Sequence, residues 1–160
     1  MRNKLILILA FIAIAFNGFS QKNNALNWKF YAENQDNGNV NLIFETTIKD
    51  GFHLYSPYNP QGASRPLEIN INDTQNFTKI DKIKEAYTPQ EKYEEFFEVT
   101  EKFFVQKAKF TIEITPKNSD KQTVTGTISG QVCKEDGFCS MVEENFSIEI
   151  NPISQKKKIK

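Results

Sequence analysis

The sequence contains few of the residues that usually bind metal ions. It has one histidine, His53, and two cysteines, Cys133 and Cys139. A structural zinc site usually needs four cysteine or histidine ligands at short spacings, and no such arrangement occurs here. We therefore expect neither a metal ion nor another cofactor. A metal at His53 would need carboxylate or cysteine ligands, and the simpler interpretation gives His53 a structural role in packing.

The chain also lacks an excess of charge of either sign. Its 20 basic and 20 acidic residues cancel, and without Arg2 and Lys4 the rest of the chain is slightly acidic. Nucleic-acid binding depends on basic side chains that neutralise phosphates, so we exclude a nucleic-acid partner. The lysine-rich end, residues 153–160, is the one cluster of like charge. We expect a disordered, solvated tail there, with a membrane-surface contact as the alternative.

Only one long apolar run is present, and it begins near the first residue. Arg2 and Lys4 precede the apolar residues 5–16, and small and polar residues follow up to Ser20. This order is typical of a secretory signal peptide. The run is too short to cross a bilayer of about 30 Å as a helix, so an uncleaved anchor is the weaker alternative. We predict a signal peptide over residues 1–20, cleavage near Ser20, and a periplasmic or secreted protein without stable membrane insertion.

Most of the remaining chain, residues 21–152, has the pattern of one β-rich domain. Apolar residues alternate with polar ones in several short segments separated by turn residues such as Asp50-Gly51 and Asn72-Asp73. A period of two is typical of half-buried strands, and many short strands without long helical periods indicate an all-β antiparallel sandwich. The predicted strands contain residues 40–48, 67–71, 110–114, 124–132 and 146–150.

Residues 85–97 do not follow this alternation. Thr88-Pro89 is followed by helix-forming residues and then by Phe96 and Phe97. Local propensity predicts a short helix that begins at Pro89. A long loop with exposed aromatic side chains is the alternative, because propensity decides little over so few residues.

The two cysteines lie only six positions apart in a chain that we expect to be exported. Cysteines in exported domains usually form disulfides, and one interpretation is a structural crosslink. However, the loop closed by Cys133 and Cys139 is short, and the chain-entropy model gives it only about 2.4 kcal/mol of stabilisation. A stabilising crosslink would more effectively join distant strands.

Local geometry favours a pair that opens and closes. Residues 124–133 and 139–150 have the pattern of two strands joined by a short turn, in which Gly137 tolerates a positive φ. Facing residues on antiparallel strands have Cα atoms about 4.5–5.5 Å apart, which a disulfide can span. Glu135 and Asp136 disfavour a nearby thiolate, so we expect a slow thiol that depends on a docked partner. The residues alone leave exchange and structural crosslinking both open.

Three short motifs are distinctive in this sequence. The first runs from Gly130-Gln131-Val132-Cys133 to Gly137-Phe138-Cys139, the second is Asp50-Gly51-Phe52-His53-Leu54-Tyr55, and the third is Glu94-Glu95-Phe96-Phe97. Together they resemble the periplasmic N-terminal domain of DsbD, the thiol:disulfide interchange protein. The first motif is similar to the active-site hairpin of that family, and the third is similar to its cap loop. The three motifs occur in the order found in the family.

The resemblance implies an immunoglobulin-like sandwich with a cap loop over the cysteine pair. It also implies electron transfer from a membrane-embedded thiol reductase, here supplied by another chain, to exported thioredoxin-like proteins. In that scheme Cys139 forms the mixed disulfide with a partner and Cys133 resolves it. The cap loop and the lining of the site would comprise Glu94, Glu95, Phe96, Phe97, His53 and Tyr55, with Phe96 as the lid and Phe97 as its anchor.

Two departures from the family pattern leave a second hypothesis open. Ser140 follows Cys139 where the family usually has a proline, and the sequence does not include the membrane and thioredoxin-like domains. The expected function is therefore thiol–disulfide interchange with a separate membrane donor. The alternative is a non-catalytic β-sandwich adaptor with a structural hairpin disulfide. Independently of this choice, Phe96 and Phe97 could be ordinary core residues instead of a lid and its anchor.

Overall fold

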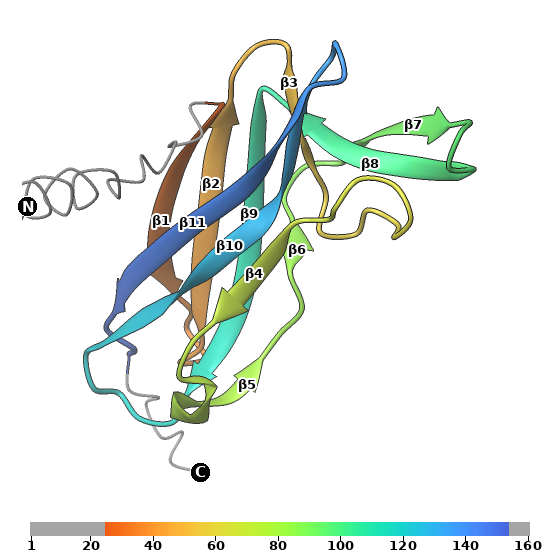
Figure 1. Cartoon of the computed structure of the whole chain (residues 1–160). Helices are drawn as coiled ribbons and strands as arrows, with labels where there is room; N and C mark the ends of the chain where they lie inside the picture. The colour runs from red at the N-terminus through yellow and green to blue at the C-terminus, as the bar shows by residue number, and fades with distance from the viewer. Residues whose placement is uncertain (1–24, 154–160) are drawn as a thin grey trace, which may run out of the picture.

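The computed structural model describes residues 25–153, which form two antiparallel β-sheets packed face to face (Figure 1). This confirms the predicted all-β sandwich. The predicted signal peptide and the part of the lysine-rich tail after Ile153 lie outside the described residues. Within residues 25–153, no helix is long and apolar enough to cross a membrane.

The first sheet has five strands in the order β1, β2, β9 and β5, with β6 also paired to β9. The strands are β1 (Leu26–Asn34), β2 (Val40–Ile48), β5 (Phe77–Ile80), β6 (Lys84–Glu85) and β9 (Lys107–Pro116). A single turn of 3-10 helix, Thr74–Asn76, precedes β5.

The second sheet has six strands and contains both cysteines. Its order is β11, β10, β3, β8 and β7, with β4 also paired to β10. The strands are β3 (Phe52–Tyr55), β4 (Glu68–Ile71), β7 (Gln90–Glu94), β8 (Val99–Val105), β10 (Gln122–Lys134) and β11 (Cys139–Ile150). Every pairing in this sheet is antiparallel.

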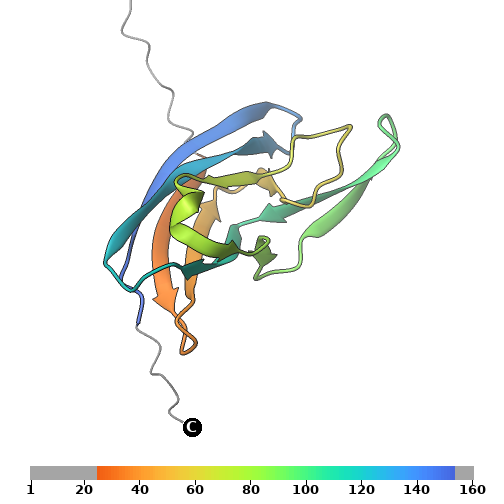
Figure 2. The same cartoon turned by 90° about the horizontal axis from the view of Figure 1, so that it is seen from below.

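The core lies between the two layers, which Figure 2 shows from below. The alternation in the sequence places the inward-facing apolar side chains of β2, β9, β10 and β11 in this core, among them Leu42, Ile112 and Ile148. Phe44 of the first sheet meets Phe146 of the second edge to face, with ring centroids 4.9 Å apart. Fully burying a Phe side chain stabilises the folded state by about 1.5–3 kcal/mol, so these aromatic contacts join the sheets firmly.

The helix predicted to begin at Pro89 is wrong. Gln90–Glu94 forms β7, which pairs with β8 from Gln90↔Phe103 to Glu94↔Val99. Helix propensity is a weak preference that tertiary pairing overrides, and β8 provides a complete row of backbone partners. The loop alternative was nearer the structure, because Phe96 and Phe97 lie exposed in the turn after β7.

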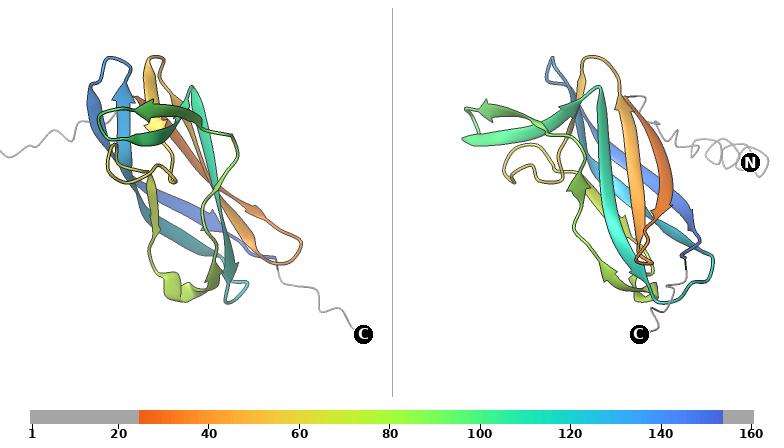
Figure 3. Two further views of the ribbon diagram at one scale, coloured as in Figure 1. Left: turned by 90° about the vertical axis from the view of Figure 1, so that its right-hand side faces the viewer. Right: turned by 180° about the vertical axis from the view of Figure 1, so that it is seen from behind.

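The β2–β3 turn and the β10–β11 turn lie together at the end of the sandwich that carries the cysteine hairpin. The β2–β3 turn contains Gly51 with a φ of 75°, a conformation that glycine adopts without strain. The backbone N–H of Glu135, in the β10–β11 turn, donates to the carbonyl of Gly51 at 3.0 Å. The β7–β8 hairpin leaves the sandwich near the same end and projects sideways from it (Figures 1 and 3).

Candidate functional site

Cys133 and Cys139 face each other at the ends of β10 and β11 and form a disulfide. Their Cα atoms lie 4.0 Å apart, somewhat closer than the spacing expected from the sequence. Gly137 has a φ of 90°, as predicted for this turn. The predicted hairpin disulfide is therefore confirmed.

The two sulfur-bearing residues differ strongly in exposure. Cys133 is only 2% exposed, whereas Cys139 is exposed and follows Phe138, which is also exposed. A thiol–disulfide exchange requires the attacking sulfur to approach the attacked one directly. An incoming protein can therefore approach Cys139 but not Cys133.

Cys133 has a second cross-strand neighbour on its other side. The register pairs Cys133 of β10 with His53 of β3, so the row across the sheet reads Cys139, Cys133, His53. Paired residues have Cβ atoms about 4.5–5.5 Å apart and share one face of the sheet. The Gln131 amide also approaches the Cys133 sulfur, with Nε2 and Sγ 3.6 Å apart.

His53 begins a chain of polar contacts on the outer face of this sheet. His53 Nε2 lies 3.0 Å from the Tyr55 hydroxyl, which donates to Glu101 Oε2 at 3.3 Å. Burial lowers the pKa of His53, and the negative charge of Glu101 opposes this effect. Burial also raises the pKa of Tyr55, so its hydroxyl keeps its proton near neutral pH.

Glu101 did not figure among the site residues predicted from sequence. It is 5% exposed and is the only charged side chain among the buried residues of 25–153. The loop after β3 covers it, and the Ser64 backbone N–H donates to Glu101 Oε1 at 2.8 Å. The sequence does place an acid within the alternating segment 99–105. The hydrogen-bond partners of Glu101 belong to a distant loop and a distant strand, however, so the sequence alone does not reveal its burial.

The four predicted cap-loop residues lie together at the tip of the β7–β8 hairpin. Glu94 ends β7, and its carboxylate pairs with Lys92 at 2.6 Å. Phe96 is 88% exposed and contacts Phe97 edge to face, with centroids 5.0 Å apart. The alternative that Phe96 is a core residue is wrong. With so much of its surface exposed, Phe96 does not cover the disulfide in this structure.

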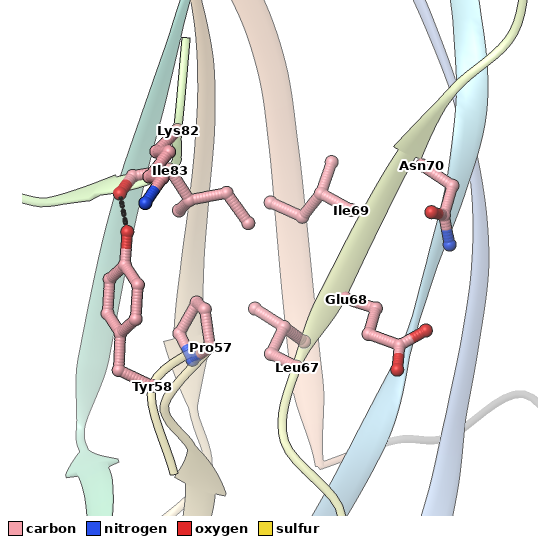
Figure 4. Close-up of a pocket in the computed structure, with 8 residues that line it drawn as sticks. All are labelled: Pro57, Tyr58, Leu67, Glu68, Ile69, Asn70, Lys82 and Ile83. Carbon is pink, nitrogen blue, oxygen red and sulfur yellow. Dashed lines mark hydrogen bonds between the residues drawn. The ribbon is translucent and has the colours of Figure 1, made fainter.

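A groove of about 400 Å³ lies between β4 and the segment that leads into β6. Figure 4 shows Leu67 and Ile69 facing Ile83 across it, with the Tyr58 hydroxyl bonded to the Ile83 carbonyl. No residue that lines the groove belongs to the cysteine hairpin. Among residues 25–153, no cluster of three His, Cys, Asp or Glu side chains is arranged to hold a metal ion.

The fold and the hairpin define a β-sandwich with a disulfide whose two cysteines differ in exposure, one exposed and one buried. The model of the family "Thiol:disulfide interchange protein DsbD, N-terminal" matches residues 19–149. The chain belongs to this family, which supports a general role in thiol–disulfide interchange.

Solved structures show the same immunoglobulin-like fold at low sequence identity. The reduced DsbD N-terminal domain of Neisseria meningitidis has 19% identity and a TM-score of 0.54, over 79% of this chain and 86% of that one. A chain in the complex of the DsbD and PilB N-terminal domains from N. meningitidis has 15% identity and a TM-score of 0.55, over 88% and 96%.

A third structure is the N-terminal periplasmic domain of ScsB from Proteus mirabilis. It has 14% identity and a TM-score of 0.54, over 81% of this chain and 47% of that one. A comparison with curated protein sequences gave no significant match.

Proposed function

We propose that Cys133 and Cys139 carry electrons between proteins of the cell envelope. The observation that carries this proposal is the exposed Cys139 beside the buried Cys133 in a chain of this family. Only the sulfur that meets a partner needs exposure, and the sulfur that resolves the mixed disulfide is best kept from other thiols. A purely structural crosslink has no need of this asymmetry.

The exchange has two steps and requires no cofactor. In the reduced protein the Cys139 thiolate attacks a partner disulfide, forms a mixed disulfide and releases one partner thiolate. Cys133 then loses its proton and attacks Cys139, which restores the Cys133–Cys139 bond and releases the second partner thiolate. Two electrons and two protons pass to the partner, and a donor reverses both steps.

The proposed acceptors are exported thioredoxin-like proteins, and the proposed donor is a membrane-embedded thiol reductase of another chain. Both follow from the family resemblance. The solved complex of DsbD and PilB domains supports a docking partner, because it shows a domain of this fold bound to another protein domain. The protein would act in the periplasm or outside the cell after signal-peptide removal near Ser20.

The β7–β8 tip is the proposed cap. Residues 99–102 of β8 do not pair with β3, and β7 is their only strand partner. The loop after β3 bonds to Glu101 and Lys102, so only the turn and the strand ends next to it are free of the sandwich. An isolated two-stranded hairpin is marginally stable, so this tip can bend relative to the sandwich. Closure would bring Phe96 over the sulfurs, with Glu95 and Phe97 on the same turn and Glu94 at the end of β7. Docking of a partner would displace it.

Phe96→Ala should raise the rate at which glutathione reduces the disulfide severalfold, because the closed cap would no longer shield the sulfurs. Since Phe96 is exposed, the free energy of unfolding should change by no more than about 0.5 kcal/mol. Stopped-flow kinetics and urea unfolding measure the two quantities. Tyr93→Ala, an exposed aromatic on the same hairpin, is the matched control. Equal rates in the wild type and both variants would remove the cap from the mechanism.

The disulfide should open under native conditions without unfolding the domain. We expect dithiothreitol to expose two thiols while the circular dichroism spectrum stays unchanged, because the short loop contributes only about 2–3 kcal/mol. Thiol counting before and after reduction checks this. A bond that resists reduction until the domain unfolds would favour the non-catalytic adaptor, and so would two free thiols in air-exposed protein.

A further inference from the structure

The hydrogen bonds that link His53, Tyr55 and Glu101 beside Cys133 have a fixed donor-to-acceptor direction. An ionised carboxylate only accepts hydrogen bonds, and both oxygens of Glu101 do so, from the Ser64 N–H and from the Tyr55 hydroxyl. Tyr55 has a single proton to donate. Since that proton points to Glu101, the Tyr55 oxygen must accept a hydrogen bond from His53 Nε2–H at 3.0 Å.

This hydrogen-bond direction selects one tautomer of the neutral His53 imidazole. A neutral histidine has one proton, and when Nε2 holds it Nδ1 has a free lone pair. Cys133 is the cross-strand partner of His53. We propose that Glu101 is a positioning residue which, through Tyr55, keeps the His53 proton on Nε2 and leaves Nδ1 to accept the proton of the Cys133 thiol.

The inference rests on the proposed function and concerns its second step. As Cys133 attacks the mixed disulfide at Cys139, its proton passes to Nδ1, the Cys133–Cys139 bond forms, and the partner sulfur leaves with the bonding electrons. In the reverse direction the imidazolium returns this proton to the departing Cys133 thiolate. A positioned general base typically contributes a factor of about 100 to 10,000 to a rate.

The charges around His53 suit this exchange. Glu101 of β8, Glu94 of β7 and Glu135 of the β10–β11 turn raise its pKa, while Lys92 of β7 and burial lower it, with burial the largest effect. The outcome is a pKa below the usual value, so His53 is neutral near neutral pH and can accept a proton. Lys92 is also the cross-strand partner of Glu101, which places a positive charge beside the buried carboxylate.

The Glu101→Gln variant tests the direction of these hydrogen bonds, because the Gln side chain has nearly the same shape as that of Glu. The Ser64 N–H would hold the amide oxygen of the new side chain, so its NH2 group would face Tyr55 and donate to it. Tyr55 would then donate to His53 Nε2, and the imidazole proton would move to Nδ1, where it blocks proton transfer from Cys133. NMR of the ring nitrogens reports this directly, because His53 is the only histidine in the chain.

We expect the Nε2–H form in the wild type and the Nδ1–H form in Glu101→Gln. The matched control is Glu91→Gln, which alters an exposed acid of β7 that pairs with Lys102 and should leave the wild-type form unchanged. The same form in the wild type and in Glu101→Gln would overturn the inference. If Glu101→Gln does not fold, Tyr55→Phe replaces it, and an unchanged preference for Nε2–H in that variant would equally overturn the inference.

The resolving step gives a second readout. Reduced protein mixed with dithiobis-nitrobenzoate should release two coloured thiolates, the second at a rate independent of reagent concentration, as Cys133 attacks the adduct on Cys139. We expect this second phase to be about tenfold to hundredfold slower in Glu101→Gln, with less dependence on pH across the titration of His53. Glu101→Asp, which retains the carboxylate, should recover part of the rate.

The kinetics also distinguish a failure of the role of Glu101 from a failure of the proposed thiol–disulfide exchange. A wild-type second phase that Glu101→Gln leaves unchanged would defeat the role of Glu101 while exchange itself stands. A wild-type protein without any concentration-independent second phase would defeat the proposed exchange, whatever form His53 adopts.

Discussion

Cys133→Ser should accumulate mixed disulfides with exported thioredoxin-like proteins, visible as bands that collapse on reduction. This variant keeps the exposed Cys139 and removes the buried sulfur that would release the partner. The intermediate is then trapped, because no internal thiol remains to resolve it. Expression of the full chain in an envelope that contains such proteins, followed by acid quenching and non-reducing electrophoresis, gives the measurement.

Cys139→Ser is the matched control, since it retains one cysteine of the same hairpin in its buried position. It should trap few or no partners. We therefore expect nearly all of the mixed disulfide in Cys133→Ser and almost none in Cys139→Ser. Equal or greater trapping by Cys139→Ser would reverse the roles of the two cysteines. If neither variant captures a partner, the adaptor becomes the better account of the protein.

Gly126→Ala should destabilise the domain by about 3 kcal/mol, near the upper end of what overpacking usually costs. A Cβ at this position would lie 2.1 Å from the carbonyl oxygen of Asn70 and 2.4 Å from the Phe146 ring. The ring belongs to the core contact between the sheets, and the carbonyl belongs to β4, which pairs with β10 at this point. Neither can move without loss of packing, and urea unfolding measures the effect.

Gly130→Ala is the control on the same strand and face. Its Cβ would meet Leu67 and Pro66 at 3.1–3.3 Å, distances that shifts of a few tenths of an ångström relieve. We expect a clearly smaller loss of stability. Equal stabilities for wild type and Gly126→Ala would mean that β4 and Phe146 are not packed on β10 as described.

The main strands could be predicted because their side chains alternate between core and solvent. The predicted segments at residues 40–48, 110–114, 124–132 and 146–150 all lie within strands of the two sheets. The strand β1 was missed although Leu26, Trp28, Phe30 and Ala32 alternate in it. The segment 85–97 was misjudged because its residues favour helices locally, while the pairing partner of β7 lies beyond the turn in β8.

The cysteine hairpin and its glycine turn could also be predicted, since spacing and turn chemistry are local. His53 and Tyr55 entered only through resemblance, and the structure brings His53 beside Cys133 through the β3–β10 pairing. Glu101 could not be found from the sequence, because its role depends on a loop that covers it and on Tyr55 from another strand. Nothing local separates a buried acid from a solvated one.

The reduction potential of the folded protein tests the central claim most directly. Equilibration of the mature domain in glutathione buffers, with acid trapping and thiol quantification, gives the potential of the Cys133–Cys139 pair. A pair that exchanges electrons should lie above about −300 mV, in the range of labile disulfides. A potential below about −300 mV, typical of structural disulfides in secreted proteins, would contradict the exchange role and leave a crosslinked adaptor.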